Sequence, residues 1–158
     1  DAVELDMPRQ TLHTRAVMYT LTPETLADIG IDATRLPGAL HAAEHAAIGL
    51  LPLVATCDRW DIGGLSTNLH PDTGLPTVFV YDGYLGGAGF AERGFGEFAT
   101  WIAATADAIA DCGCELGCPS CVQSPKCGNG NEPLDKAGAL DVLRSITHLI
   151  RGMTHLAS

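Results

Sequence analysis

Five of the six cysteines of this 158-residue chain lie in one short segment, from Cys112 to Cys127. Thiols this close together constrain a fold strongly, because the backbone must wrap around any ion that they bind jointly. The N-terminal residues show no basic stretch followed by an apolar one, so crowded cysteines favour metal ligands in a reducing compartment over a disulfide framework. The sixth cysteine, Cys57, stands apart. We therefore expect a metal loop at 112–131.

The spacing inside this segment favours one zinc ion, which prefers four thiolates in a tetrahedron. Cys118 and Cys121 form a CxxC pair, which turns two thiolates toward one point. Cys127 is the next candidate ligand, because the sequence around it is similar to half of such a pair. Cys112 and Cys114 are one residue apart, which makes joint binding strained. The set of the first four cysteines remains a competing choice, and an iron–sulfur cluster or disulfides are weaker alternatives. Because four thiolates leave no open position, such a zinc is structural.

A second pattern, HxxEH, runs from His41 to His45 and is typical of inverted zinc peptidases. On a helix the two histidines share one face, with Glu44 beside them as a base. The third ligand that a peptidase needs would be Glu92, Glu97 or Glu115. The pattern is short, and the simpler interpretation is a polar stripe on an otherwise apolar helix.

Several signals bear on nucleotides and nucleic acids. The net charge of −10, from 9 basic and 19 acidic residues, argues against tight DNA binding by this chain alone. No GxxxxGK[ST] motif occurs, so the glycines of 86–89 indicate a turn, and we expect neither ATP hydrolysis nor a catalytic residue. Candidates for stacking or phosphate contacts with single-stranded DNA are Arg59, Trp60, Tyr84 and Arg93, with Tyr81 as a further aromatic residue.

Hydrophobic periodicity predicts one α+β domain over residues 1–158, with a small mixed sheet packed by about three main helices. Strands are expected near 15–21, 61–67 and 77–82. A short helix should follow Thr22-Pro23, and longer ones are expected at 39–53, at 97–111 and from Pro133 onward. The metal loop would join the last two helices. No run of eighteen apolar residues suggests a membrane span.

Four stretches together resemble a known family. They are the run from His41 to Leu53, the run from Cys57 to Gly64, the run from Tyr81 to Phe90, and the run from Gly117 through Cys127-Gly128-Asn129 to Lys136. The chain is similar to the C-terminal zinc-binding domain of MrfA/SftH-type superfamily 2 DNA helicases, the bacterial relatives of the fungal RecQ-like repair helicases. The resemblance covers nearly the whole chain, and its cysteine block is the most specific part.

This resemblance implies that the chain is a fragment of a cytoplasmic, ATP-dependent 3′-to-5′ DNA translocase that acts in repair. Its partners would be N-terminal motor domains, which carry ATP and Mg²⁺, and single-stranded DNA. It implies one structural zinc held by four of the five clustered cysteines, and it assigns no reaction to this domain. The domain would stabilise the motor and help to guide the strand. A zinc-dependent protein-interaction module remains the alternative beside the peptidase.

Overall fold

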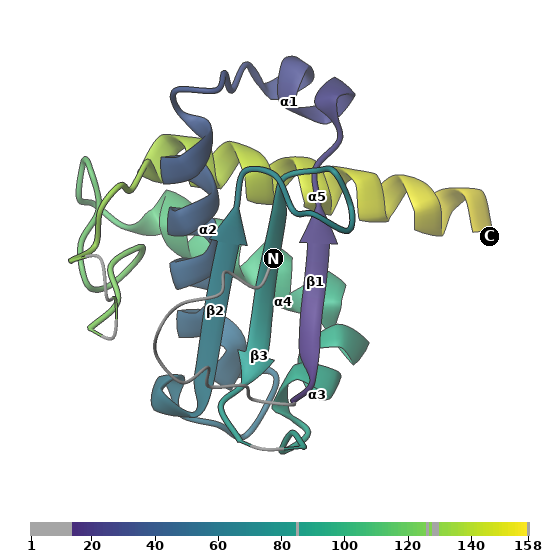
Figure 1. The fold of residues 1–158 in the computed structure, drawn as a ribbon, viewed down its shortest axis with the longest axis vertical. Coiled ribbons are helices and arrows are strands. Elements are labelled where there is room, and N and C mark those ends of the chain that lie inside the picture. The colour runs from purple at the N-terminus through teal and green to yellow at the C-terminus, as the bar shows by residue number, and fades with distance from the viewer. Residues whose placement is uncertain (1–13, 85, 126, 128–129, 158) are drawn as a thin grey trace, which may run out of the picture.

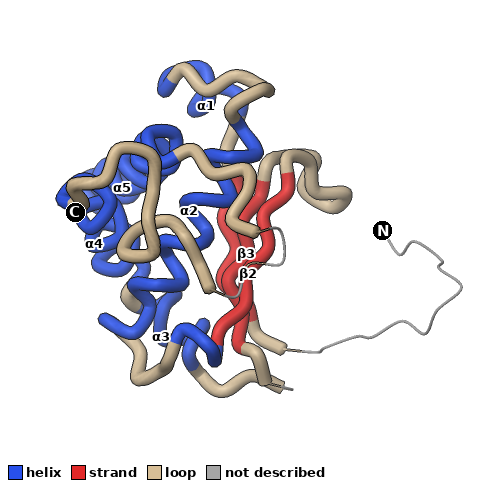
Figure 2. Tube along the Cα trace, turned by 90° about the vertical axis from the view of Figure 1, so that its left-hand side faces the viewer, coloured by secondary structure: helices blue, strands red, loops and turns tan. Residues whose placement is uncertain are grey.

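Three antiparallel strands form the sheet of the protein. The computed structural model describes residues 14–84, 86–125, 127 and 130–157. The strands are β1 (Ala16–Thr20), β2 (Ile62–Thr67) and β3 (Thr77–Asp82), and β3 lies between the other two. Helices cover one face of this sheet, and the other face carries no helix in the described part of the chain (Figure 1, Figure 2).

Five α-helices complete the fold. They are α1 (Pro23–Ile29), α2 (Leu36–Leu50), α3 (Phe90–Gly96), α4 (Phe98–Asp111) and α5 (Lys136–Ala157), with 3₁₀ turns η1 (Leu51–Leu53) and η2 (Arg59–Asp61). The helix α2 is central, because it packs on β2 and β3 and also on α4 and α5. The described residues between 112 and 135, which lie between α4 and α5 in the sequence, are found on the side of the molecule next to α2 (Figure 1).

The sequence of α2 explains why it occupies the centre. Its buried alanines include Ala39, Ala43 and Ala47, none of which exposes any surface. Small side chains let neighbouring helices approach closely, and the indole N–H of Trp101 on α4 donates to the Ala47 carbonyl at 2.8 Å. On the other side, a Cβ on Gly64 of β2 would lie 2.5 Å from Glu44 Oε2, so a glycine is required there.

The glycine-rich turn after β3 is built around the buried carboxylate of Asp82. Its Oδ2 accepts the backbone N–H groups of Ala88 (2.6 Å) and Gly89 (3.0 Å), and its Oδ1 accepts that of Ala91 (2.8 Å). Gly87 and Gly89 have positive φ values of 86° and 89°, which side-chain-bearing residues rarely adopt. The N–H groups that a phosphate loop would offer to a nucleotide are thus used by the chain's own carboxylate.

The α+β class and the position of the cysteine loop between α4 and α5 are confirmed. The sheet differs from the mixed one expected, since both of its pairings are antiparallel. The helix α3 was not expected, because glycines at both of its ends obscure a helical pattern. The last helix begins at Lys136 and not at Pro133, because Asp135 caps it. Over the described residues, no helix is both long and apolar enough to cross a membrane.

Candidate metal centre

Four of the five clustered thiols lie together just beyond the end of α4. Their Sγ atoms are separated by 3.6 Å for Cys112–Cys114, 3.4 Å for Cys112–Cys118, 3.5 Å for Cys114–Cys121 and 3.9 Å for Cys118–Cys121. A tetrahedron of thiolates around zinc, with Zn–S distances of about 2.3 Å, has edges of about 3.8 Å. Four of the six edges are thus close to this value, and all four ligand atoms lie within 4.8 Å of one another, so one zinc ion fits among the thiols. All six cysteines are free of disulfides.

Local backbone geometry turns these thiols inward. The N–H groups of Cys121 and Gln123 both donate to the Cys118 carbonyl, at 3.0 and 3.1 Å, which closes a knuckle around the CxxC pair. Gly117 has a φ of 129°, and a Cβ on it would lie 2.6 Å from a methyl carbon of Val122. Cys112 is the C-cap of α4: its N–H still donates to the Ile109 carbonyl, but its backbone is already extended, so the chain leaves the helix between Cys112 and Cys114.

Lys136, the first residue of α5, supports this cluster from outside. Its ammonium donates to the carbonyl of Cys112 at 2.9 Å, to the carbonyl of Cys114 and to the Cys114 thiol at 3.2 Å. A cation here offsets the negative charge that thiolates add around a metal. In the sequence, Lys136 appears only as the last residue of the family-like run that begins at Gly117. Its position directly after a cysteine loop was the signal available.

The thiols of the cluster have divergent pKa values. Burial opposes ionisation of Cys114, but hydrogen bonds from Lys136 and from the other three thiols outweigh it and lower its pKa to about 6. Burial raises the pKa of Cys121 to about 12, assisted by the neighbouring sulfurs. The Cys114 thiolate thus forms easily, whereas the buried Cys121 thiol needs a nearby cation to ionise.

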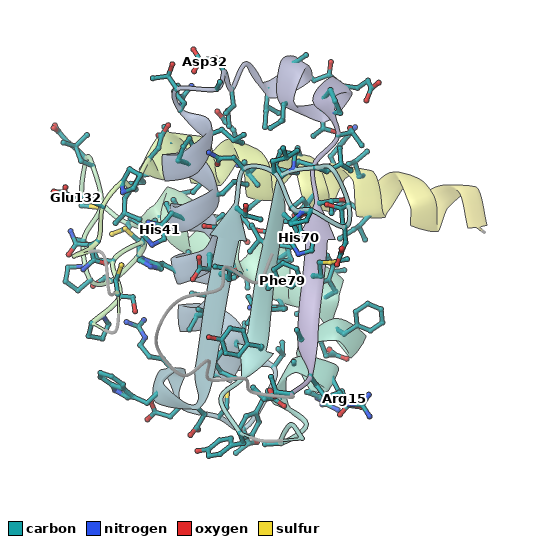
Figure 3. The ribbon with its side chains drawn as sticks, viewed as in Figure 1. Arg15, Asp32, His41, His70, Phe79 and Glu132 are labelled. Carbon is teal, nitrogen blue, oxygen red and sulfur yellow. The ribbon has the colours of Figure 1, made fainter. Side chains whose placement is uncertain are left out.

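Cys127, the fifth thiol, is absent from this group and faces α2 instead. Its Sγ lies 3.5 Å from Nε2 of His41, and together with His45 these residues form a second cluster whose ligand atoms all lie within 4.8 Å of one another. The glutamates considered as a third ligand for the HxxEH pattern are not members of it. Figure 3 shows His41 on the side of α2 that faces the loop carrying Glu132.

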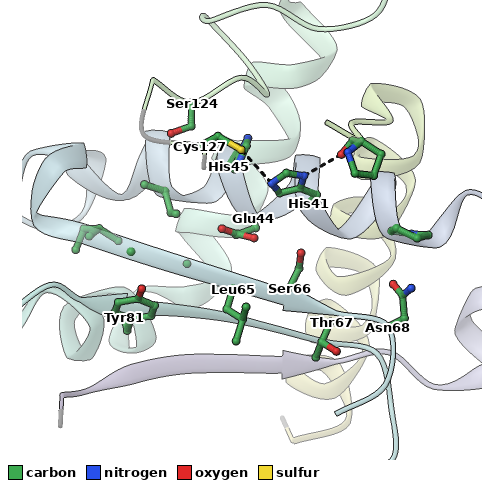
Figure 4. Close-up of a pocket in the computed structure, with 16 residues that line it drawn as sticks. His41, Glu44, His45, Leu65, Ser66, Thr67, Asn68, Tyr81, Ser124 and Cys127 are labelled. Atoms are coloured by element: carbon green, nitrogen blue, oxygen red, sulfur yellow. Dashed lines mark hydrogen bonds between the residues drawn. The ribbon is translucent and has the colours of Figure 1, made fainter. Parts of the chain in front are cut away.

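A pocket of about 600 Å³ adjoins this second cluster, between α2, the edge strand β2 and the cysteine loop (Figure 4). The carboxylate of Glu44 points from α2 toward β2, where Ser66 hydrogen-bonds it. Burial raises the pKa of Glu44 to about 7, an effect that the Ser66 hydrogen bond partly opposes. The expected polar stripe is therefore a buried, polar pocket wall, and not a solvated helix face.

Of the four residues considered for DNA contact, Arg59 and Trp60 lie in η2, Tyr84 lies in the turn after β3, and Arg93 lies in α3. Trp60 and Tyr84 expose 62% and 49% of their surface, and the Tyr84 hydroxyl donates to the Asp61 carboxylate. Arg93 uses its Nε–H to donate to the Val54 carbonyl at 3.0 Å. The guanidinium of Arg59 lies over α2, since a Cβ on Gly49 would be 2.7 Å from it. Both aromatic side chains are thus largely exposed at the surface, and both arginines contact other parts of the fold.

Comparison with protein families gives one match, to the model described as the MrfA Zn-binding domain, over residues 43–122. That range includes most of α2, the whole sheet except β1, and the four-thiol cluster.

Similar curated proteins include the uncharacterized protein MJ1572.1 of Methanocaldococcus jannaschii, which is 36% identical over 68% of this chain and 98% of its own length. The uncharacterized ATP-dependent helicase YprA of Bacillus subtilis is 35% identical over 75% of this chain. The ATP-dependent helicase HRQ1 of Saccharomyces cerevisiae is 24% identical over 92% of it. The chain spans 15% of the length of YprA and 14% of that of HRQ1.

Among solved structures, the DUF1998 helicase MrfA bound to DNA matches 90% of this chain with a TM-score of 0.71 and 30% identity. The same helicase bound to DNA and AMPPNP matches 89% with a TM-score of 0.60 and 31% identity. The matched part makes up 18% and 16% of those chains.

Proposed function

Because this chain belongs to the family of MrfA Zn-binding domains, we propose that it is the zinc-stabilised accessory domain of an ATP-dependent DNA helicase. In this proposal the parent protein is a cytoplasmic 3′-to-5′ translocase that acts in DNA repair, and its motor domains bind ATP and Mg²⁺. The helicase names of similar proteins and the DNA-bound structures of MrfA support it. The net charge of −10 fits a domain that relies on a motor to hold the strand.

The zinc ligands in this proposal are Cys112, Cys114, Cys118 and Cys121. The observation that carries the assignment is the set of four Sγ separations between 3.4 and 3.9 Å, which match the edges of a zinc–thiolate tetrahedron. A closed tetrathiolate site offers no position for substrate, so the ion stabilises the loop and does no chemistry. With that set filled, Cys127 is the cysteine left out.

Changing Lys136 to Met is expected to weaken zinc binding at this site about ten-fold, because the thiolates lose a charged hydrogen-bond donor outside the first ring of ligands. Competition with a chromophoric chelator measures the change. Lys136→Arg keeps the positive charge and should lose less affinity. Equal zinc affinity in all three chains would show that Lys136 does not support the metal.

The open face of the sheet supports the role in bracing a motor. Register aligns Met18, Phe79 and Leu65 in one row across the three strands. Met18 and Leu65 expose 49% and 54% of their surface, whereas the row on the opposite face, at Val17 and Val80, is buried. Apolar side chains in a continuous row are typical of a surface that packs against protein. We assign this face as the surface that contacts the motor domains of the full-length parent protein.

The guiding role is assigned to Trp60 and Tyr84, whose exposed rings offer platforms on which bases stack. In the full-length protein, Trp60→Ala is expected to lower affinity for single-stranded DNA about ten-fold, since one stacked base contributes about 1–3 kcal/mol. Fluorescence anisotropy with a labelled oligonucleotide measures it.

Leu69→Ala is the matched control, because Leu69 is 68% exposed and follows the opposite end of β2.

DNA-stimulated ATP hydrolysis should be present in the full-length protein and absent from the 158-residue chain. A full-length protein without that activity would refute the helicase assignment. Unchanged DNA affinity in Trp60→Ala would refute the guiding role alone.

A further inference from the structure

A second group of metal-ligating side chains lies outside the four-thiol site. His41 and His45 lie one turn apart on α2, and Cys127 approaches them from the cysteine loop. Their ligand atoms all lie within 4.8 Å of one another, and their rings are 4.2 Å apart between centroids. Two imidazoles and one thiol are donors that suit zinc and neighbouring divalent transition metals.

Hydrogen bonds orient both imidazoles as metal ligands. Nδ1 of His41 lies 2.9 Å from the Pro133 carbonyl, and Nδ1 of His45 lies 2.8 Å from the Val122 carbonyl. A carbonyl oxygen can only accept, so each Nδ1 carries the proton and each Nε2 keeps a lone pair. This arrangement, in which one ring nitrogen donates to a carbonyl and the other binds the ion, is typical of metal-bound histidines.

The buried surroundings also suit neutral, metal-bound imidazoles. His45 is buried, with 6% of its surface exposed, and its ring packs edge-on against that of His41. The thiol of Cys127 is half-buried and lies 3.5 Å from Nε2 of His41 (Figure 4). A hydrogen bond between that thiol and one imidazole accounts for two of the three groups. It leaves Nε2 of His45 without an assigned role.

We propose that His41, His45 and Cys127 bind a second divalent zinc-class metal ion, whose fourth position opens into the adjoining pocket. Within the described residues no further side chain joins the group, and the pocket of about 600 Å³ has room for a water molecule as the fourth ligand. Polar groups of Ser66 and Asn68, together with the Glu44 carboxylate, lie on its wall. Three protein ligands leave the fourth position to an exchangeable water molecule, which the closed tetrathiolate site cannot bind.

Metal stoichiometry tests the proposal. The reduced chain is freed of metal, reloaded with excess Zn²⁺ and passed through a desalting column, and bound zinc is then measured by mass spectrometry. We expect two zinc ions per chain, and one in Cys127→Ser or in His41→Ala. Cys57→Ser and His148→Ala, which change a cysteine and a histidine outside both clusters, should keep two. Loading with Co²⁺ gives a second readout, because a His₂Cys site and a tetrathiolate site absorb differently.

One zinc in the unmodified chain, retained in Cys127→Ser and lost in Cys121→Ser, would overturn the second site and leave the tetrathiolate site standing. One zinc lost in Cys127→Ser and retained in Cys121→Ser would instead overturn the ligand set given under the proposed function. Circular dichroism of each variant separates loss of a ligand from loss of the fold. If Cys127→Ser does not fold, His41→Ala decides: two zinc ions in that variant would overturn the second site.

Discussion

A Cys121→Ser chain is expected to lose the zinc of the four-thiol site and to melt about 15 °C below the unmodified chain. Cys121 is the most deeply buried ligand of the four, with 5% of its surface exposed. A serine hydroxyl is a poor zinc ligand, and three thiolates left without a cation repel one another. Loss of a structural metal costs about 5 kcal/mol, and each kilocalorie shifts the melting temperature of a domain this size by about 3 °C.

Thermal unfolding followed by circular dichroism and zinc analysis of the purified chain measure this effect. Cys57→Ser is the control, because Cys57 belongs to neither cluster and burial raises its thiol pKa to about 11. A chelator, which removes the metal from both clusters, should lower the melting temperature of the unmodified chain at least as far as Cys121→Ser does. Full zinc content and an unchanged melt in Cys121→Ser would exclude Cys121 from the ligand set.

The second large effect is expected at Asp82. An Asp82→Ala chain should lose about 3 kcal/mol of stability, because the buried N–H of Ala91 would have no acceptor and the N–H groups of Ala88 and Gly89 would lose a charged one. Asp82 exposes none of its surface and Ala91 is buried, whereas Ala88 and Gly89 are exposed. Urea denaturation at constant zinc concentration measures the loss.

Asp82→Asn keeps one acceptor oxygen and is expected to lose about half as much stability. Asp72→Ala removes an exposed aspartate from the β2–β3 turn and should have no measurable effect. If Asp82→Ala were as stable as Asp72→Ala, the turn at 83–89 would hold its conformation without the carboxylate.

Local sequence patterns predicted most elements of the fold, because those elements are set by near neighbours. Thr22 caps α1 as its position before Pro23 indicates, and the apolar run 77–82 forms the central strand. The helix α3 escaped prediction because its N-cap, Gly89, provides no side chain, and the capping role passes to Asp82 on the preceding strand. Asp82 and Ala91 come together only in the folded chain, and no periodic pattern in the sequence predicts that they interact.

The sequence showed where along the chain the metal-ligating residues lie, but it did not show that they form two separate clusters. CxxC spacing identifies Cys118 and Cys121, because that signal is local. The different environment of Cys127 arises from its contact with His41, 86 positions earlier in the sequence. The HxxEH pattern indicated two histidines on one face of a helix, and the structure shows them there. The third potential ligand beside them is the thiol of Cys127, whereas the sequence suggested a glutamate. Only the tertiary fold brings these groups together.

The contacts of the cysteine loop also have a consequence for the order of folding. The four thiols from Cys112 to Cys121 are close in sequence, so an ion can gather them while the rest of the chain is still unfolded. The contacts that dock the loop on α2 join residues 77 and 92 positions apart, and the Arg35–Asp135 ion pair joins residues 100 apart. Contacts of such high sequence separation form late. We therefore expect the metal-bound loop to form early, and its docking on α2 to be one of the last steps of folding.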